Sequence, residues 1–156
     1  MILDPPLNID GTRKRILDAV LQLFTGMLPW QTMPSLRFKA WDQIQSTAKP
    51  ALIFLYDGES QDYDGEGMPA KITMSLPAFI YWDVNHLDES QVPVYTTVEI
   101  LDRFSEILRP PPIFGTKQTL GGLVSHCWIE GETQVSSGDL DGHGLAVIPL
   151  KILIPS

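Results

Sequence analysis

The longest regular pattern in this 156-residue sequence is an alternation of apolar and polar side chains between residues 71 and 84. The apolar residues of one parity run from end to end of it: Ile72, Met74, Leu76, Ala78, Ile80, Trp82 and Val84. Because neighbouring side chains of a strand point to opposite faces, the pattern predicts one long strand with one buried face. Pro77 has no N–H to donate to a ladder, so we expect the strand to bend there or to lie at a sheet edge.

The second half of this strand is apolar on both faces. Phe79 and Tyr81 take the parity that is polar in the first half, and Trp82 follows them. Two explanations remain open at this stage. Either the chain itself covers both faces of the sheet there, or a partner chain covers one of them.

Several further strands are predicted. A continuous apolar run at residues 50–56 indicates a buried strand, and the alternation at residues 36–41 indicates a short strand with one wet face. The last third of the chain predicts a strand within 119–130, a return strand that begins at 134–136, and a final strand at 145–154 that contains Pro149. Residues 57–69 and 138–144 are predicted loops.

Two helices are predicted from apolar spacing of three and four residues. The first begins with Thr12 as its cap, fades at Gly26 and is over by Pro29. The second begins near Thr96, where Thr96 and Glu99 are spaced as a capping box, and it ends at Arg109 before three prolines.

This order of elements predicts an α+β fold. Two main helices pack on a mostly antiparallel sheet, which can be mixed, in a single domain that spans residues 1–156. Residues 1–11 are rich in proline and are expected to form a flexible or docking arm.

Charge and composition exclude several classes of protein. The net charge of −8 argues against broad nucleic-acid binding, which needs clustered Lys and Arg. No apolar run approaches the length of about 20 residues that a membrane-spanning helix needs. No secretory signal is visible, and the single cysteine, Cys127, favours a reducing cytoplasm.

The nucleophiles and metal ligands of the chain do not form a recognised motif. His126 and Cys127 are adjacent, so on a strand they point to opposite faces and could not easily share a metal ion. A Cys127 nucleophile would need a separate base such as His143, and no Gly-x-Ser-x-Gly or phosphate-binding glycine pattern occurs. We therefore expect no catalytic residues and no cofactor.

Two acidic loops carry Asp-x-Asp-Gly, at Asp62 to Gly65 and at Asp139 to Gly142. Neither has the bidentate Glu that ends a calcium loop of the EF-hand type, because Lys71 and Ile148 stand at that position. The Asp-Gly pairs are therefore expected to supply turn geometry. The wider acidic group is interpreted as a solvated or partner-facing loop; it comprises Asp57, Glu59, Asp62, Asp64 and Glu66.

The C-terminal third resembles a known family. Residues Thr119 to Gly131, Gly138 to Gly142 and Ala146 to Leu150 are similar to tail terminator (minor tail) proteins of long-tailed bacteriophages. The helix at Arg15-Ile16-Leu17-Asp18-Ala19 and the strand at Pro50-Ala51-Leu52 are also similar to that family.

The resemblance implies a structural virion protein without turnover. Such proteins form hexameric rings at the head-proximal end of the tail tube, stop tube polymerisation, and join the tail to head completion proteins. Partners would be further copies of the chain, the tail tube protein and a head completion or connector protein, with DNA only as passing cargo and no membrane. The chain would be made in the host cytoplasm and would end in the neck of the virion.

Ten residues are candidates for subunit or partner contacts. They are the acidic loop residues Asp57, Glu59, Asp62, Asp64 and Glu66, the apolar residues Phe79, Tyr81 and Trp82, and the second loop's Asp139 and Asp141. Two alternatives to a ring stay open: another neck component such as a head–tail connector or stopper, and a small hydrolase or metal-binding domain built on Cys127, His126 or the acidic loops.

Overall fold

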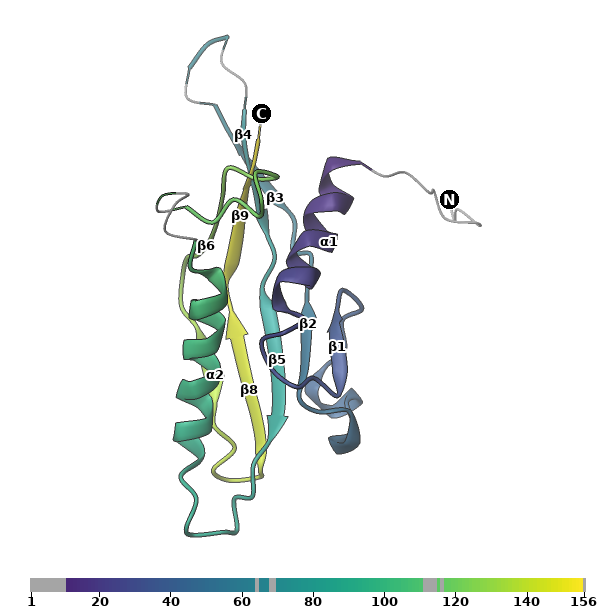
Figure 1. The fold of residues 1–156 in the computed structure, drawn as a ribbon, viewed down its shortest axis with the longest axis vertical. Coiled ribbons are helices and arrows are strands. Elements are labelled where there is room, and N and C mark those ends of the chain that lie inside the picture. The colour runs from purple at the N-terminus through teal and green to yellow at the C-terminus, as the bar shows by residue number, and fades with distance from the viewer. Residues whose placement is uncertain (1–10, 64, 68–69, 111–114, 116, 156) are drawn as a thin grey trace, which may run out of the picture.

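The computed structural model describes residues 11–63, 65–67, 70–110, 115 and 117–155. It is an α+β fold (Figure 1). The helices are α1 (Thr12–Phe24) and α2 (Pro93–Leu108), with two short 3-10 turns at Trp41–Gln43 and Ser46–Ala48. The strands are β1 (Thr32–Ser35), β2 (Ala51–Phe54), β3 (Glu59–Asp62), β4 (Lys71–Ser75), β5 (Ala78–Asp83), β6 (His126–Ile129), β7 (Gln134–Ser136), β8 (His143–Ile148) and β9 (Leu150–Ile154).

These strands form two sheets. Sheet A has the order β1-β2-β5-β8-β7, and sheet B has the order β3-β4-β9-β6. All pairs are antiparallel except β1 with β2. The predicted fold class is confirmed, with two sheets in place of one.

Both sheets are built on one central ribbon. Segments 71–83 and 143–154 pair antiparallel, first as β4 with β9 and then as β5 with β8. The register is continuous across the change of sheet, which places Pro77 opposite Pro149. The prediction of one long strand is wrong: the strand is interrupted at Pro77, where β4 of sheet B ends at Ser75 and β5 of sheet A begins at Ala78.

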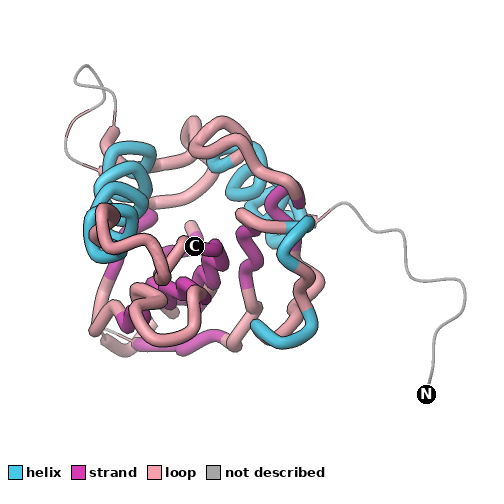
Figure 2. The backbone as a smooth tube through the Cα atoms, turned by 90° about the horizontal axis from the view of Figure 1, so that it is seen from below, coloured by secondary structure: helices cyan, strands magenta, loops and turns pink. Residues whose placement is uncertain are grey.

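The core lies between sheet A and the two helices. Both helices cover the same face of that sheet (Figures 1 and 2). Phe24 of α1 stacks on Phe104 of α2 with ring centroids 4.5 Å apart, and it also meets Phe54 of β2 at 5.5 Å. All three rings are fully buried. None of the helices among the described residues has the length and apolar character needed to cross a membrane.

Part of the opposite face of sheet A is covered by residues 36–48, here called the strap. Sequence alternation predicted a strand at 36–41, and this is wrong: the strand precedes it, at β1. The strap instead lies over the sheet, where the Phe38 ring meets Phe79 edge to face at 4.9 Å. Its alternating apolar residues therefore reflect packing on a sheet and not membership of one.

Both predicted helix caps are wrong. Thr12 is the first residue of α1 and Gly11 caps it without a side-chain hydrogen bond. The second helix begins at Pro93, three residues before the expected cap at Thr96, and Val92 is its N-cap. Proline suits the first helical position because it has no N–H to leave unpaired, so the helix starts earlier than the capping-box pattern indicates.

Three predictions for loops and strands also need correction. The predicted loop at 57–69 contains β3, which pairs with β4. Within the segment 119–130, only the residues of β6 form the predicted strand. The segment 134–136 does not return along β6; it joins β8 in sheet A, whereas β6 joins β9 in sheet B.

Candidate functional site

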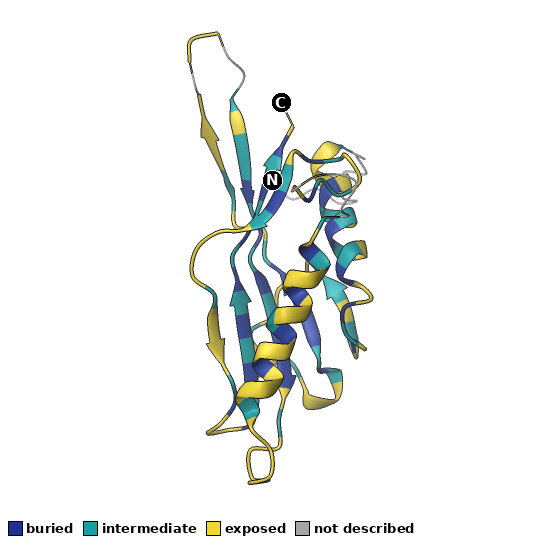
Figure 3. Cartoon of the chain, turned by 60° about the vertical axis from the view of Figure 1, so that its left-hand side comes forward, coloured by how far each residue is buried: buried dark blue, intermediate teal, exposed yellow. Residues whose placement is uncertain are grey.

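The first acidic group lies along the hairpin of β3 and β4. Asp57, Glu59 and Asp62 line a hollow of about 450 Å³ together with Trp128 and Lys151 from the same sheet. Glu66 is exposed near the tip of the hairpin, which projects beyond the rest of the molecule (Figure 3). Asp64 lies outside the described residues.

Glu59 is not free to bind a partner. Its carboxylate accepts hydrogen bonds from Nε and Nη2 of Arg13 at 2.7 and 2.8 Å and from the Tyr56 hydroxyl at 2.7 Å. The Arg13 contact holds the pKa of Glu59 below its usual value. The contact therefore joins the start of α1 to β3.

We predict that Glu59→Gln lowers the free energy of unfolding at neutral pH by about 1 kcal/mol, because it removes the charge from a two-nitrogen contact. A lowered carboxyl pKa gives stability that is present above the usual Glu value and is lost as the pH falls through the lowered one. Urea unfolding should therefore show the difference at neutral pH and not in acid. Asp18→Asn is the control: Asp18 pairs with Lys14 at 3.5 Å, both groups are half exposed, and the change should be under about 0.3 kcal/mol.

The second acidic loop forms a turn between β7 and β8. The Asp141 carboxylate accepts a hydrogen bond from the His143 backbone N–H at 2.9 Å, and Gly142 has a left-handed backbone with φ of 79°. The turn geometry expected of this Asp-Gly pair is confirmed. Asp139 is exposed in the same loop. Among the described residues, no three His, Cys, Asp or Glu side chains are grouped so that they could hold a metal ion.

The two acidic loops do not form one site. The β3–β4 hairpin lies at one end of the long axis, and the loop before β8 lies toward the other end (Figure 1). Any partner that contacts both would have to extend along most of the molecule.

The apolar stretch of β5 is covered by the chain itself. The Tyr81 hydroxyl donates to the backbone carbonyl of Lys39 in the strap at 2.8 Å, and Tyr81 is only 2% exposed. Trp82 points to the other face, where its ring lies against Gly144, and it is 3% exposed. Of the two explanations left open by the sequence, the first holds for these residues, so Tyr81 and Trp82 present no surface to a partner; Phe79 is half-buried under the strap.

A polar cluster that the sequence did not reveal fixes the strap to the sheet. The buried Lys49 ammonium lies 2.9 Å from Asp83 Oδ1, and His143 Nδ1 lies 3.2 Å from the same oxygen. Partial burial raises the pKa of Asp83, but hydrogen bonds from Lys49, Ser46 and His143 outweigh it, so that the pKa lies below its usual value. Asp83 and His143 are 60 positions apart and are brought together by the register of β5 and β8, whereas Lys49 reaches Asp83 from the segment that follows the strap.

The neighbouring groove lies between α2 and residues 28–29 and 46–50, and the charged residues that line it are paired. It encloses about 410 Å³, and its charged residues include Lys49, Glu99 and Arg103. Lys49 pairs with Asp83, and Arg103 lies 3.4 Å from Glu99. The groove therefore offers no free ion to a charged ligand.

Cys127 is not prepared to act as a nucleophile. It is 2% exposed, and burial raises the pKa of its thiol to about 12. His126 stacks on Trp128 at 5.0 Å, and since residues two apart share a strand face, it lies on the face away from Cys127. His143 belongs to the Lys49 and Asp83 cluster of sheet A.

We predict that Cys127 in the native protein reacts with a thiol reagent at least roughly a hundredfold more slowly than in the unfolded chain, because the thiolate is scarce and covered. Absorbance assays with an aromatic disulfide, with and without denaturant, measure both rates. Fast labelling of the native thiol would contradict its burial and would favour the hydrolase alternative.

Sheet A ends on each side in a short edge strand that is paired on one side only. β1 forms one edge and β7 the other, and no described strand pairs with their outer sides. Large apolar side chains are exposed near both. Close to β1 they are Met33, Leu36 and Phe38; in α2, β7 and the loops beside them they are Leu87, Val92, Val94, Tyr95, Val98, Val135 and Leu140. The exposed Trp41 of the strap belongs to neither group, because its ring meets His143 of β8 at 5.7 Å.

None of the predicted contact residues belongs to these two groups. The sequence did not single them out because each apolar residue fits a strand or helix pattern, and its exposure depends on which neighbours the fold brings to it. No family model and no curated protein matches the chain. Its function is therefore inferred from its own residues and geometry.

Proposed function

We propose that this chain is a structural subunit of a ring at the head-proximal end of a phage tail tube. There it would end tube polymerisation and join the tail to the head completion proteins, with DNA passing through the ring. The ring would consist of several copies, six by the resemblance described above, and would lie in the neck of the virion.

One observation carries this proposal: sheet A presents two different apolar edges, at β1 and at β7. A closed ring needs a heterologous interface, in which two unlike patches of each subunit meet. A monomeric protein rarely leaves two separate apolar surfaces uncovered without a binding role. The strongest contrary feature, Cys127, is buried with a raised pKa.

Immunogold labelling of virions tests the proposal. An antibody raised against the chain should mark the neck, between head and tail, and particles made without the chain should carry tails of uncontrolled length. Labelling at the distal tip, or tails of normal length without the chain, would contradict it. Labelling at the neck together with normal tail length would favour the connector or stopper alternative.

A further inference from the structure

The charge of the chain is divided unevenly between the two edges of sheet A. Residues 12–49 form α1, β1 and the strap, here called the β1 side; they hold six Lys and Arg and two Asp, a net charge of +4. Arg13 and Lys49 pair with Glu59 and Asp83 outside this range, so a charge of +2 is left for the surface. Residues 85–109 and 130–141 include α2 and β7, here called the β7 side; they hold nine Asp and Glu and two Arg, a net charge of −7. A positive side is unexpected in a chain whose net charge is −8.

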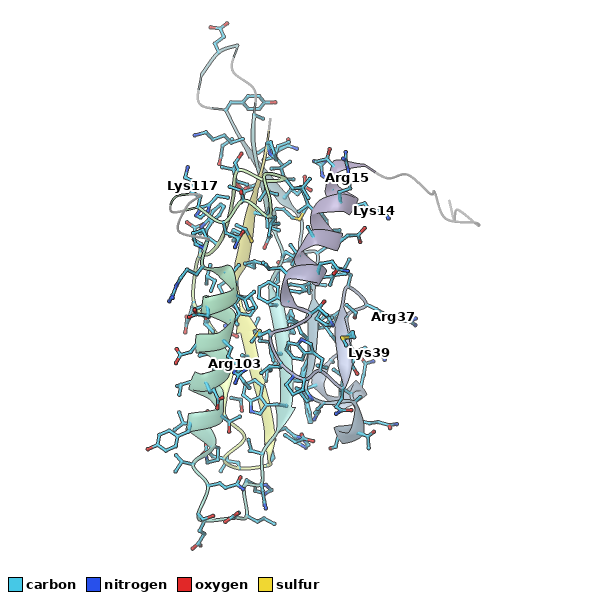
Figure 4. The ribbon with its side chains drawn as sticks, viewed as in Figure 1. Lys14, Arg15, Arg37, Lys39, Arg103 and Lys117 are labelled. Carbon is cyan, nitrogen blue, oxygen red and sulfur yellow. The ribbon has the colours of Figure 1, made fainter. Side chains whose placement is uncertain are left out.

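The two sides face in different directions. β1 and β7 are the opposite edge strands of a five-stranded sheet. Figure 4 shows Lys14, Arg15, Arg37 and Lys39 together on the margin of the molecule formed by α1 and β1, while α2 lies on the other margin. Each side can therefore meet a different neighbour at the same time.

The two cationic side chains of the strap form no ion pair within the described part of the chain. Arg37 and Lys39 are exposed, and neither has an ion-pair partner there. Apolar surface stands beside them, since Met33 is 61% exposed and Phe38 is 41% exposed. Apolar area flanked by unpaired charge is the usual composition of a protein interface with its rim.

The β7 side has the same composition with the opposite sign. Tyr95 is 69% exposed and Val135 is 51% exposed. Asp102 and Asp139 are exposed, and among the described residues neither has an ion-pair partner. The Thr97 hydroxyl donates to Ser137 at 2.8 Å, which joins α2 to the loop after β7 as one surface.

We propose that the β1 side of one copy binds the β7 side of the next copy, head to tail. The proposal rests on the proposed function, because it identifies the two contact surfaces of the ring. Opposite charge steers these sides together, whereas two β1 sides or two β7 sides would repel each other. The apolar residues on each side are then removed from water, which supplies the affinity.

Site-specific cross-linking tests this arrangement directly. Cys127 is buried, so cysteines introduced at Met33 and at Val135 would be the reactive ones. With a flexible bis-maleimide at high protein concentration and low salt, a mixture of Met33→Cys and Val135→Cys should give a cross-linked dimer. Either variant alone should give little, and the double variant should give a ladder of multiples. Dimers from one variant alone would show a symmetric contact, and no dimer in the mixture would also overturn the proposal.

Charge exchange provides a second, independent measurement. Arg37→Glu with Lys39→Glu should reduce self-association at least about tenfold, measured by sedimentation velocity. A second variant, with Asp102→Lys and Asp139→Lys, should be equally impaired alone. Mixing the two variants should restore association, because the reversed side of each variant then meets a side of opposite charge on the other. Carrying all four changes in one chain should restore association. The control Lys117→Glu lies outside both sides and should have no effect; failure of the four-fold variant to recover would contradict charge pairing.

The two proposals can fail separately. If the head-to-tail cross-link forms but virions are not labelled at the neck, the proposed interface stands and the proposed tail function is wrong. If virions are labelled at the neck but charge exchange does not affect self-association, the proposed function stands and the proposed interface is wrong. If duplex DNA binds the chain, and Arg37→Glu with Lys39→Glu abolishes that binding while self-association is absent, the β1 side is a nucleic-acid surface and the proposal is wrong.

Discussion

Gly144→Ala is expected to lower the free energy of unfolding by about 3 kcal/mol, the upper part of the range for overpacked cores. A Cβ atom at this position would overlap the indole ring of Trp82 on the neighbouring strand. The obstacle is the five-membered ring of a buried side chain that is 3% exposed, and not the end of a flexible one. Because Gly144 does not have a left-handed backbone, the cost arises from the overlap and not from backbone strain. Chemical denaturation measures it.

A matched control and a double-mutant cycle separate overlap from a general loss of glycine. Gly26→Ala adds the same atom where nothing lies within 4 Å, and it should change stability by no more than about 0.5 kcal/mol. Combining Gly144→Ala with Trp82→Leu should cost at least about 1 kcal/mol less than the sum of the single changes, because the smaller side chain leaves room for the new methyl group. Strict additivity would show that the ring is not the cause.

Phe104→Ala should destabilise the chain by about 4 kcal/mol, within the range for large buried aromatic residues. Phe104 is the contact of α2 with α1, through its stack on Phe24, and both rings are fully buried. The two helices have few other contacts with each other, so the cavity would open where they meet over sheet A. Thermal or urea unfolding followed by circular dichroism measures the loss.

Tyr95→Ala is the matched control for this prediction. It truncates an aromatic residue of the same helix that is 69% exposed, and in dilute monomer it should cost no more than about 0.5 kcal/mol. Equal losses for Phe104 and Tyr95 would mean that helix propensity, and not the aromatic stack, dominates. A loss below about 1 kcal/mol for Phe104 would contradict the packing of α2 on α1.

The strands of the central ribbon were largely predictable, because alternation and proline act on neighbouring residues. The pattern at 71–84 predicted a buried face, which is found, and a single strand, which is instead divided at Pro77 into β4 and β5. The strap was not predictable in the same way. Its apolar residues alternate as a strand's do, but β1 occupies the sheet edge and the strap packs on the sheet through Phe38 and Lys39.

The candidate site was harder to predict than the fold. Acidic and aromatic residues were selected because they were conspicuous in the sequence, yet Glu59 bonds to Arg13 and Tyr81 lies under the strap. Arg37 and Lys39 were read as the wet face of a strand and not as candidates. Contacts between distant segments decide whether a side chain is bonded within the chain or exposed to a partner. A local sequence pattern does not predict such contacts.

The proline pair of the central ribbon has a consequence for strand register. Sliding one strand by two residues would keep every side chain on its own face, so hydrophobic alternation alone does not forbid it. In the observed register Pro77 and Pro149 share one level, and their carbonyls accept from Leu55 and Glu130 in the flanking segments. A slip would separate the prolines and leave a missing donor at two levels, one of them inside a paired stretch. The two prolines thus favour one strand register among several that would all keep the apolar side chains on the buried face.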